Sequence, residues 1–219
     1  MTINFLQRFF SYFYPIKVAD AVGKTTPHIG LYRYAGRWQL SAATALYSDG
    51  AAYRPIRAAF NYLKKELPQK QKMLVLGGGL GSAVAILHKL KLPIHSTLVE
   101  IDPQIISWGK DIIDAETQYP CQWINADVQQ FVSQHNATYD LIVLDVFQDR
   151  IVPLFVSTAS FLQQCKTLMS GDKSVLIFNY IINNEENWKE ALSNIQSVFK
   201  IEHTISIGIN RIMMLRNNA

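Results

Sequence analysis

From about residue 73 onward, short hydrophobic runs alternate with longer stretches in which apolar residues recur at helical spacing. The runs predict strands at residues 73–76, 96–101, 121–124, 141–144 and 174–178. The stretches between and after them predict helices that extend through residue 90, over 103–113, through 135, over 155–168 and over 185–199. Two more predicted strands, 201–207 and 211–215, follow one another without a helix between them.

This alternation predicts one α/β sheet. Parallel neighbours need a long crossover connection, which is usually a helix, so five strand–helix units indicate a doubly wound, mostly parallel sheet. The last two strands lack such a connection, which indicates that one of them runs antiparallel. We therefore predict an α/β fold with a seven-stranded, mostly parallel sheet.

The first part of the chain has a different pattern. Residues 29–40 carry apolar and aromatic residues in rough alternation on either side of Ala35-Gly36, which predicts a β-hairpin. Residues 53–67 have helical periodicity, with Pro55 in the first turn, where proline is tolerated. Pro68 is expected to end this helix.

A polar stretch at residues 69–72 precedes the alternating strands and helices. We predict two domains there: an N-terminal helix, hairpin and helix region over 1–68, and a ligand-binding α/β domain over 69–219. The aromatic-rich segment 5–13 has near-helical spacing, which is typical of a docking or dimer-contact helix. A membrane-surface anchor is the alternative, although the segment carries little positive charge.

The composition excludes several classes of protein. Hydrophobic residues make up 49% of the 219 residues, which argues against disorder, and no apolar run reaches the ~18–20 residues of a membrane span. The 21 basic and 17 acidic residues give a net charge of +4, and with no recognition motif we expect no nucleic-acid partner. Two cysteines and five scattered histidines indicate no disulfide framework and no metal site, so we expect reduced thiols in a cytoplasmic protein.

Candidate chemistry gathers where the predicted parallel strands end, which is where open α/β sheets bind ligands. The first such end carries Gly77, Gly78, Gly79 and Gly81. Glycines allow a tight turn and a close ligand approach, and the next helix presents free N–H groups to polar ligand atoms. The turn suits a dinucleotide as well as an adenosyl sulfonium, and a tight turn without a ligand is the alternative.

The second strand end carries an acid. Glu100 follows Gly81 at close to the ~20 residues expected for a carboxylate that accepts both hydroxyls of a ribose. Ile101, beside it, belongs to the same candidate cofactor site, whereas Asp102 is expected to cap the next helix. A solvated loop acid is the alternative for Glu100.

The third strand end carries Asp127, which is placed to accept from an adenine amino group. Ala126 or Val128 would then offer a backbone N–H to the ring. A helix cap is the alternative for this aspartate.

The fourth strand end carries Asp145, where a buried strand emerges over the cofactor. There a carboxylate can hold or deprotonate an incoming amine, and partial burial would raise its pKa toward a useful value. Asp149 either assists or pairs with Arg150 at the surface.

With these motifs, the segment from about residue 31 to 215 resembles the spermidine synthase (polyamine aminopropyltransferase) family, within the class I superfamily of methyltransferases that use S-adenosylmethionine (AdoMet). The motifs are a GGGxG loop at 77–81, Val-Glu-Ile-Asp at 99–102, Asp127 and Asp145. The resemblance is strongest to the spermidine synthase-like branch of the family.

The resemblance implies a class I methyltransferase-like Rossmann fold with a small N-terminal β-region and a homodimer that uses that region. It implies that Glu100 binds the ribose, Asp127 the adenine side and Asp145 the reacting amine. Asp49 and Tyr53 match the family's D-E-x-x-Y run, which would place Tyr53 at the substrate pocket.

Several positions depart from the family's pattern. Leu80 stands where aminopropyltransferases have an aspartate that holds the aminopropyl amine, and Thr44 stands where they have a glutamine. Arg54-Pro55 places a cation after Tyr53, and the second acid after the fourth strand, Asp149, is displaced by one residue. The donor half of the pattern is kept, and the polyamine half is eroded.

We therefore predict an AdoMet-dependent transferase that moves a methyl group to an unidentified small acceptor such as an amine. Asp145, Tyr53 and Asp149 are its predicted catalytic residues. One alternative is aminopropyl transfer from decarboxylated AdoMet, as in polyamine biosynthesis. Another is a non-catalytic protein that kept the fold for binding.

Overall fold

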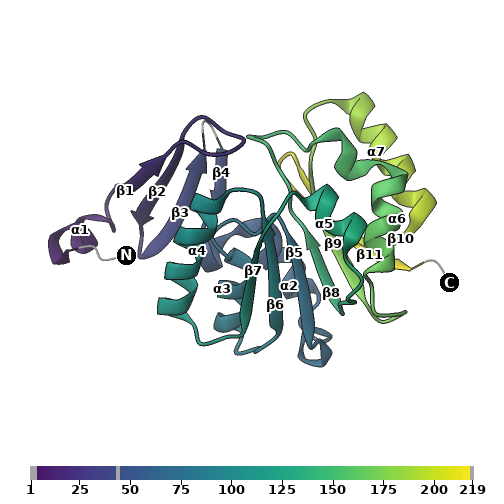
Figure 1. Ribbon diagram of the computed structural model, residues 1–219, viewed down its shortest axis with the longest axis horizontal. Coiled ribbons are helices and arrows are strands. Elements are labelled where there is room, and N and C mark those ends of the chain that lie inside the picture. Colours follow the sequence, from purple (N-terminus) through teal and green to yellow (C-terminus); the bar gives the residue numbers. More distant parts are fainter. Residues whose placement is uncertain (1–3, 43–44, 218–219) are drawn as a thin grey trace.

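Two β-sheets organise the chain in the computed structural model, which describes residues 4–42 and 45–217 (Figure 1). The larger sheet has seven strands in the order β10-β11-β9-β8-β5-β6-β7. Its strands are β5 (Lys72–Leu76), β6 (His95–Glu100), β7 (Cys121–Asn125), β8 (Leu141–Leu144), β9 (Val175–Ile181), β10 (Phe199–Ile207) and β11 (Asn210–Asn217). The pairs among β5 to β9 are parallel, and β11 is antiparallel to both β9 and β10. The predicted seven-stranded, mostly parallel sheet is confirmed.

The order of the strands reverses between β5 and β8. The chain moves outward from β5 to β6 and β7, and it then returns to place β8 on the other side of β5. Connections leave such a reversal point in opposite directions, so a crevice opens at the carboxyl ends of the two central strands. This point carries both the glycine turn and Asp145.

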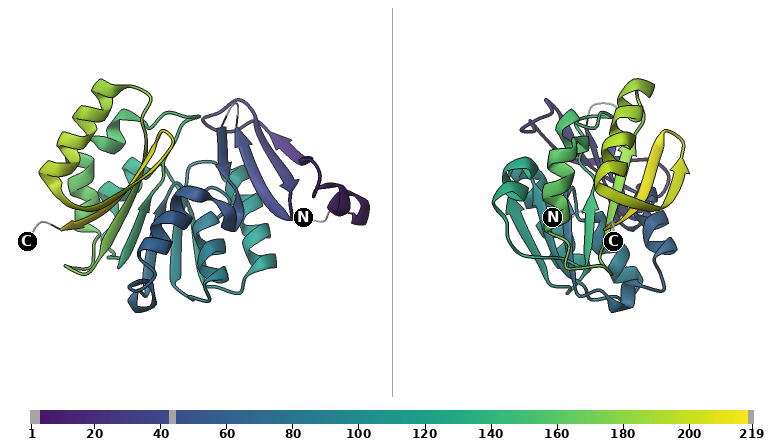
Figure 2. Two further views of the ribbon diagram at one scale, coloured as in Figure 1. Left: turned by 180° about the vertical axis from the view of Figure 1, so that it is seen from behind. Right: turned by 90° about the vertical axis from the view of Figure 1, so that its right-hand side faces the viewer.

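Helices cover both faces of the large sheet (Figure 2). Side chains of α5, α6 and α7 pack in one core cluster, and those of α2 and α3 pack in another. The helices are α1 (Phe5–Phe10), α2 (Arg54–Tyr62), α3 (Ser82–Lys89), α4 (Pro103–Glu116), α5 (Val128–Gln134), α6 (Ala159–Thr167) and α7 (Glu185–Val198). The helix α2, which belongs to the predicted N-terminal region, packs against the large sheet. The domain division at residue 69 stays a prediction.

Two predicted helices are shorter than their periodicity suggested. The helix expected over 53–67 ends at Tyr62, and Pro68 lies in a separate 3₁₀ turn, η2 (Leu67–Gln69). The prediction that Pro68 ends this helix is therefore wrong, because the helix already stops at Tyr62 with Leu63 as its C-cap. The helix expected over 155–168 begins at Ala159, because Thr158 caps it by accepting the Phe161 N–H, and a 3₁₀ turn, η3 (Leu154–Ser157), precedes it.

The smaller sheet is antiparallel, with strands in chain order. Its strands are β1 (Ile16–Ala21), β2 (Ile29–Tyr34), β3 (Arg37–Ala42) and β4 (Ala45–Ser48). The predicted hairpin is β2–β3, and Ala35 and Gly36 turn it with φ of 49° and 75°, as a two-residue turn of that hand requires. The sequence pattern did not predict β1 or β4. Apolar residues of this sheet pack on α4, so the sheet is fixed beside the crevice.

The aromatic side chains of residues 5–13 lie on the surface. The helix there, α1, spans only Phe5–Phe10, and Phe5 and Phe13 are 81% and 68% exposed. A dimer contact through this surface stays a prediction, and so does a membrane-surface contact. Within the described residues, no helix combines the length and the apolar character that crossing a bilayer requires.

Gly77 joins the two central strands sterically. It has φ of +90°, and a Cβ atom at this position would collide with the backbone carbonyl oxygen of Asp145. The glycine turn after β5 and the end of β8 can therefore lie this close only without a side chain at residue 77.

We predict that Gly77→Ala lowers the free energy of unfolding by about 3 kcal/mol or more, from backbone strain together with the collision. The control is Gly208→Ala, since Gly208 also has positive φ but has open space around it. Urea denaturation followed by circular dichroism measures both variants. Equal losses in the two variants would contradict the steric account.

Candidate active site

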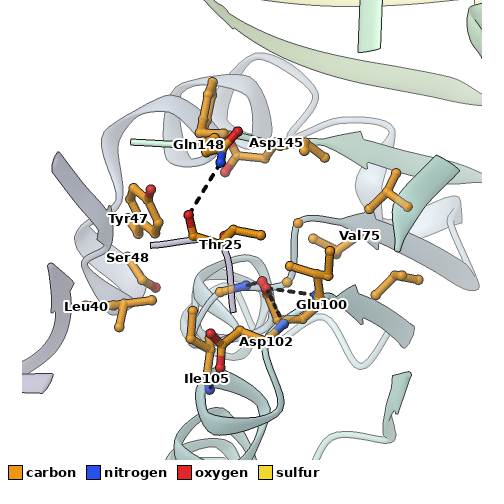
Figure 3. Close-up of a pocket in the computed structure, with 18 of the residues that line it drawn as sticks. Thr25, Leu40, Tyr47, Ser48, Val75, Glu100, Asp102, Ile105, Asp145 and Gln148 are labelled. Atoms are coloured by element: carbon orange, nitrogen blue, oxygen red, sulfur yellow. Dashed lines mark hydrogen bonds between the residues drawn. The ribbon is translucent and has the colours of Figure 1, made fainter. Parts of the chain in front are cut away.

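A cavity of about 370 Å³ lies at the carboxyl ends of the central strands, between the two sheets (Figure 3). That volume is in the ordinary range for small-molecule sites. Leu40, Tyr47 and Ser48 line it from the smaller sheet, while strand ends of the larger sheet line it from the other side. Asp145 and Gln148 lie at one end, and Glu100 and its neighbours lie at the other.

The glycine turn forms part of the cavity wall. Gly77, Gly78 and Gly79 line the cavity, and Gly79 donates its N–H to Oε2 of Glu100 at 3.0 Å. Gly81 is not among the described lining residues; it caps α3 with φ of 81° and packs against Ile113. Three of the four predicted glycines therefore meet the cavity, and the fourth shapes the turn.

Glu100 is held by backbone N–H groups. Its Oε1 accepts from Ile101 at 2.9 Å and from Asp102 at 3.2 Å. Burial raises the pKa of the Glu100 carboxyl, and the three N–H donors oppose that rise. Oε2 receives one N–H among the described residues and keeps capacity to accept a further hydrogen bond.

Asp102 and Asp127 cap the helices that follow them. Asp102 caps α4 as predicted, and its Oδ2 accepts the Lys24 N–H at 2.6 Å. Asp127 caps α5 through Oδ1, which accepts two backbone N–H groups. Asp127, Val128 and Ile101 also line the cavity, so the cap and the ligand interpretations of Asp127 are compatible.

Asp145 emerges from β8 with one carboxyl oxygen engaged. Its Oδ1 accepts from Nδ2 of Asn179 at 2.8 Å and from the Tyr53 hydroxyl at 3.3 Å. No described residue donates to Oδ2, and Asp145 lines the cavity. Loss of hydration raises the pKa of the Asp145 carboxyl to about 6, while the Asn179 and Tyr53 donors oppose the rise.

Tyr53 precedes α2 and lines the cavity, as its place in the motif predicts. Burial and the Asp145 carboxylate raise the pKa of the Tyr53 phenol well above its ordinary value. The phenol therefore keeps its proton and acts as a hydrogen-bond donor to Asp145.

Asn179 is a site residue that the motifs did not reveal. Its side chain is fully buried in β9, and its Oδ1 accepts from Nδ2 of Asn210 at 2.9 Å. The available signal was one amide inside the apolar run 175–181. A buried amide needs hydrogen-bond partners, so such a residue indicates a polar neighbour across the sheet.

Asp149 is the predicted catalytic residue with the least support from the geometry. It has φ of 58°, and its backbone N–H contacts the Tyr47 hydroxyl. Asp149 is not among the described residues that line the cavity, whereas Gln148 is, and Nε2 of Gln148 donates to the Thr25 carbonyl at 3.4 Å. A catalytic role for Asp149 stays a prediction.

The departures from the family's pattern lie mostly outside the cavity wall. Leu80 is 2% exposed and packs with Trp108, so it offers nothing to a ligand in this cavity. Arg54 is exposed and is not among the described lining residues, so the structure does not place its cation where an amine would bind. Asp49 accepts from Arg37 and Gln39. Thr44 lies outside the described residues.

The charges of the cavity have one sign. Of the described residues that line it, four are acidic and none is Lys, Arg or His. The acids are Glu100, Asp102, Asp127 and Asp145. Such a wall favours a positively charged ligand. No three His, Cys, Asp or Glu side chains within the described ranges gather as a metal site.

Comparison with known proteins assigns the chain to a family. The family model of the spermine/spermidine synthase domain matches residues 60–211. The polyamine aminopropyltransferase of Vibrio vulnificus is 26% identical over 132 residues, which are 56% of this chain and 44% of that protein. The chain thus spans less than half the length of the curated relatives it matches.

Solved structures show the same fold. A probable spermidine synthase from Corynebacterium glutamicum matches with a TM-score of 0.75 at 18% identity, over 93% of this chain and 81% of that one. Human methyltransferase-like protein 13 in complex with SAH matches with a TM-score of 0.63 at 22% identity, over 76% and 81% of the two chains. The fold is therefore that of the class I methyltransferases, and the chain itself belongs to the spermine/spermidine synthase family.

Proposed function

We propose that this chain transfers an aminopropyl group from decarboxylated AdoMet to a small amine. The sequence alone favoured methyl transfer; the family match and the curated aminopropyltransferase relatives support the alternative better. The observation that carries the proposal is the Asp145 carboxyl, which lines the cavity and accepts from both Asn179 and Tyr53 through Oδ1. The acidic wall also suits two cationic reactants.

Glu100 and Asp127 would hold the nucleoside of the donor. Oε2 of Glu100 and Oδ2 of Asp127 remain open to the ribose hydroxyls and the adenine amino group, respectively. Ile101 and Val128 line the same region, and Gly77 to Gly79 let the ligand approach the backbone. Such a donor supplies a carbon that is activated by the positive charge of its sulfur.

Asp145 would orient the amine and accept its proton. The amine nitrogen must lose a proton as it forms its bond to carbon, and a carboxylate within hydrogen-bond reach can take it. A base with a pKa of about 6 is ionised at neutral pH and is more basic than an ordinary aspartate. Tyr53, which stays protonated, would keep Oδ1 engaged and direct Oδ2 toward the amine.

Methyl transfer from AdoMet is the second candidate, and Leu80 is the observation that favours it. This buried leucine replaces the acid that aminopropyltransferases direct at the aminopropyl ammonium. A donor that keeps its carboxylate needs that acid less. The homodimer predicted from the resemblance is compatible with either reaction.

Titration calorimetry with each donor compares the two candidates. We expect decarboxylated AdoMet to bind at least tenfold more tightly than AdoMet, because the cavity wall is acidic and lacks Lys and Arg among its described residues. Glu100→Gln should weaken the binding of both donors about tenfold. The control, Glu116→Gln, lies at an exposed site and should leave the binding of both donors unchanged. Tighter binding of AdoMet would favour methyl transfer, and no binding of either would contradict both.

Asp145→Asn should reduce turnover about 10²–10⁴-fold, because the amide cannot accept the proton. In the wild type, kcat/KM should fall as the pH decreases through about 6, where the Asp145 carboxyl becomes protonated. The assay follows release of the thioether product with a panel of mono- and diamines. A variant as active as the wild type would remove Asp145 from the mechanism.

Asp145→Asn should also remove a pH dependence from the stability of the fold. The raised pKa means that the native wild type binds more protons than the unfolded chain between about pH 4 and 6, so its stability falls as the pH rises through that window. The variant lacks this fall. We therefore expect the free energy of unfolding of the variant minus that of the wild type to be roughly 2 kcal/mol larger at pH 7.5 than at pH 4.5. Urea unfolding at the two pH values measures the difference; a pH-independent difference would indicate an ordinary pKa.

A further inference from the structure

Asn210 is linked to Asp145 through one intermediate residue, Asn179, in a chain of side-chain hydrogen bonds. It begins β11, beside the hairpin turn that joins β10 to β11. Its Nδ2 donates to Oδ1 of Asn179 at 2.9 Å, and Nδ2 of Asn179 donates to Oδ1 of Asp145 at 2.8 Å. Asn210 itself is not among the described residues that line the cavity.

The amide of Asn179 has two orientations with very different consequences. In the observed one, its N–H groups face Asp145 and the Tyr53 hydroxyl, 2.8 and 3.5 Å away, and its oxygen faces the Asn210 donor. A flip would turn the Asn179 oxygen toward the carboxylate and leave two N–H groups facing each other. Because Asn179 is fully buried, water cannot compensate the mismatch that a flip creates at its own amide.

The side chain of Asn210 therefore favours the observed orientation of the Asn179 amide from one side, as the Asp145 carboxylate does from the other. Strand pairing supplies the geometry: Ile212 pairs with Asn179 and Asn210 pairs with Ile181 across the β9–β11 ladder. This register brings the two amides into contact from different strands. The motifs of the glycine turn and strand ends contain neither residue.

We propose that Asn210 is a positioning residue for the amine-transfer reaction, acting through Asn179 to keep a donor on Oδ1 of Asp145 and leave Oδ2 for the acceptor. The role of Asn210 in this reaction rests on the proposed function. The influence of Asn210 on the Asp145 carboxyl is independent of the proposed function, because it can be measured in the ligand-free protein.

The titration of Asp145 responds to the charged and polar groups that face it. Tyr53, from the start of α2, is the titratable side chain in contact with it. Glu100, Asp102 and Asp127 line the same cavity from the ends of β6 and β7, and no Lys, Arg or His does so among the described residues. Asn179 is the donor from β9. A substitution at Asn210 reaches Asp145 through that donor.

The test is a ¹³C NMR titration of the Asp145 carboxyl in the ligand-free protein, with the signal assigned by its loss in Asp145→Asn. Asn210→Leu removes the donor, and Asn210→Asp keeps the shape of the side chain but cannot donate once ionised. We expect both to raise the pKa of Asp145 by about one pH unit, a tenfold change in its proton affinity. Ile209→Ala, in the adjacent exposed turn, is the control and should leave the titration unchanged.

With an amine acceptor that the wild type uses, the acidic limb of kcat/KM should move by the same amount in the Asn210 variants. Their kcat well above this limb should fall less than that of Asp145→Asn. An unchanged Asp145 titration in either folded Asn210 variant, checked by circular dichroism, would overturn the proposal. A wild type without turnover on any amine would count against the proposed function alone, since the NMR titration would still report the coupling.

Discussion

The site depends on one carboxylate that loses much of its hydration at the point where the strand order reverses. Asp145 leaves β8 directly beside the glycine turn after β5, and this approach requires that residue 77 has no side chain. Two donors, Asn179 and Tyr53, offset the cost of an ionised carboxyl there, and no Lys, Arg or His lines the cavity among the residues that the structure describes. A cation in contact with Asp145 would neutralise this charge and leave little of it for the amine of the proposed reaction.

The other acids of the cavity have structural roles that leave part of each carboxyl available. Glu100 accepts three backbone N–H groups, and Asp127 caps α5 through one oxygen. These contacts fix where the remaining lone pairs point before any ligand arrives. Pre-organisation of this kind would lower the entropic cost of binding the nucleoside of the proposed donor. A helix cap and a binding residue are therefore compatible roles for the same aspartate.

The sequence predicted the large sheet and the positions of Glu100, Asp127 and Asp145 because each acid lies at the end of a parallel strand or within two residues of it. Parallel strands bring such positions to one edge whatever their separation along the chain. It could not predict which way Leu80 and Arg54 point, since the packing of α4 and the start of α2 decides that. The Asn179–Asn210 contact depends on the register of β9 against β11, where a slip of one residue would move the Asn210 side chain to the other face. The strands β1 and β4 were missed because neither has a clear apolar alternation.

A crystal structure with decarboxylated AdoMet bound tests the central claim most directly. We predict that the ribose hydroxyls contact Glu100, that the adenine lies beside Asp127, and that Oδ2 of Asp145 faces the space next to the carbon attached to sulfur. A nucleoside bound elsewhere, or an Asp145 side chain turned away from that carbon, would contradict the account.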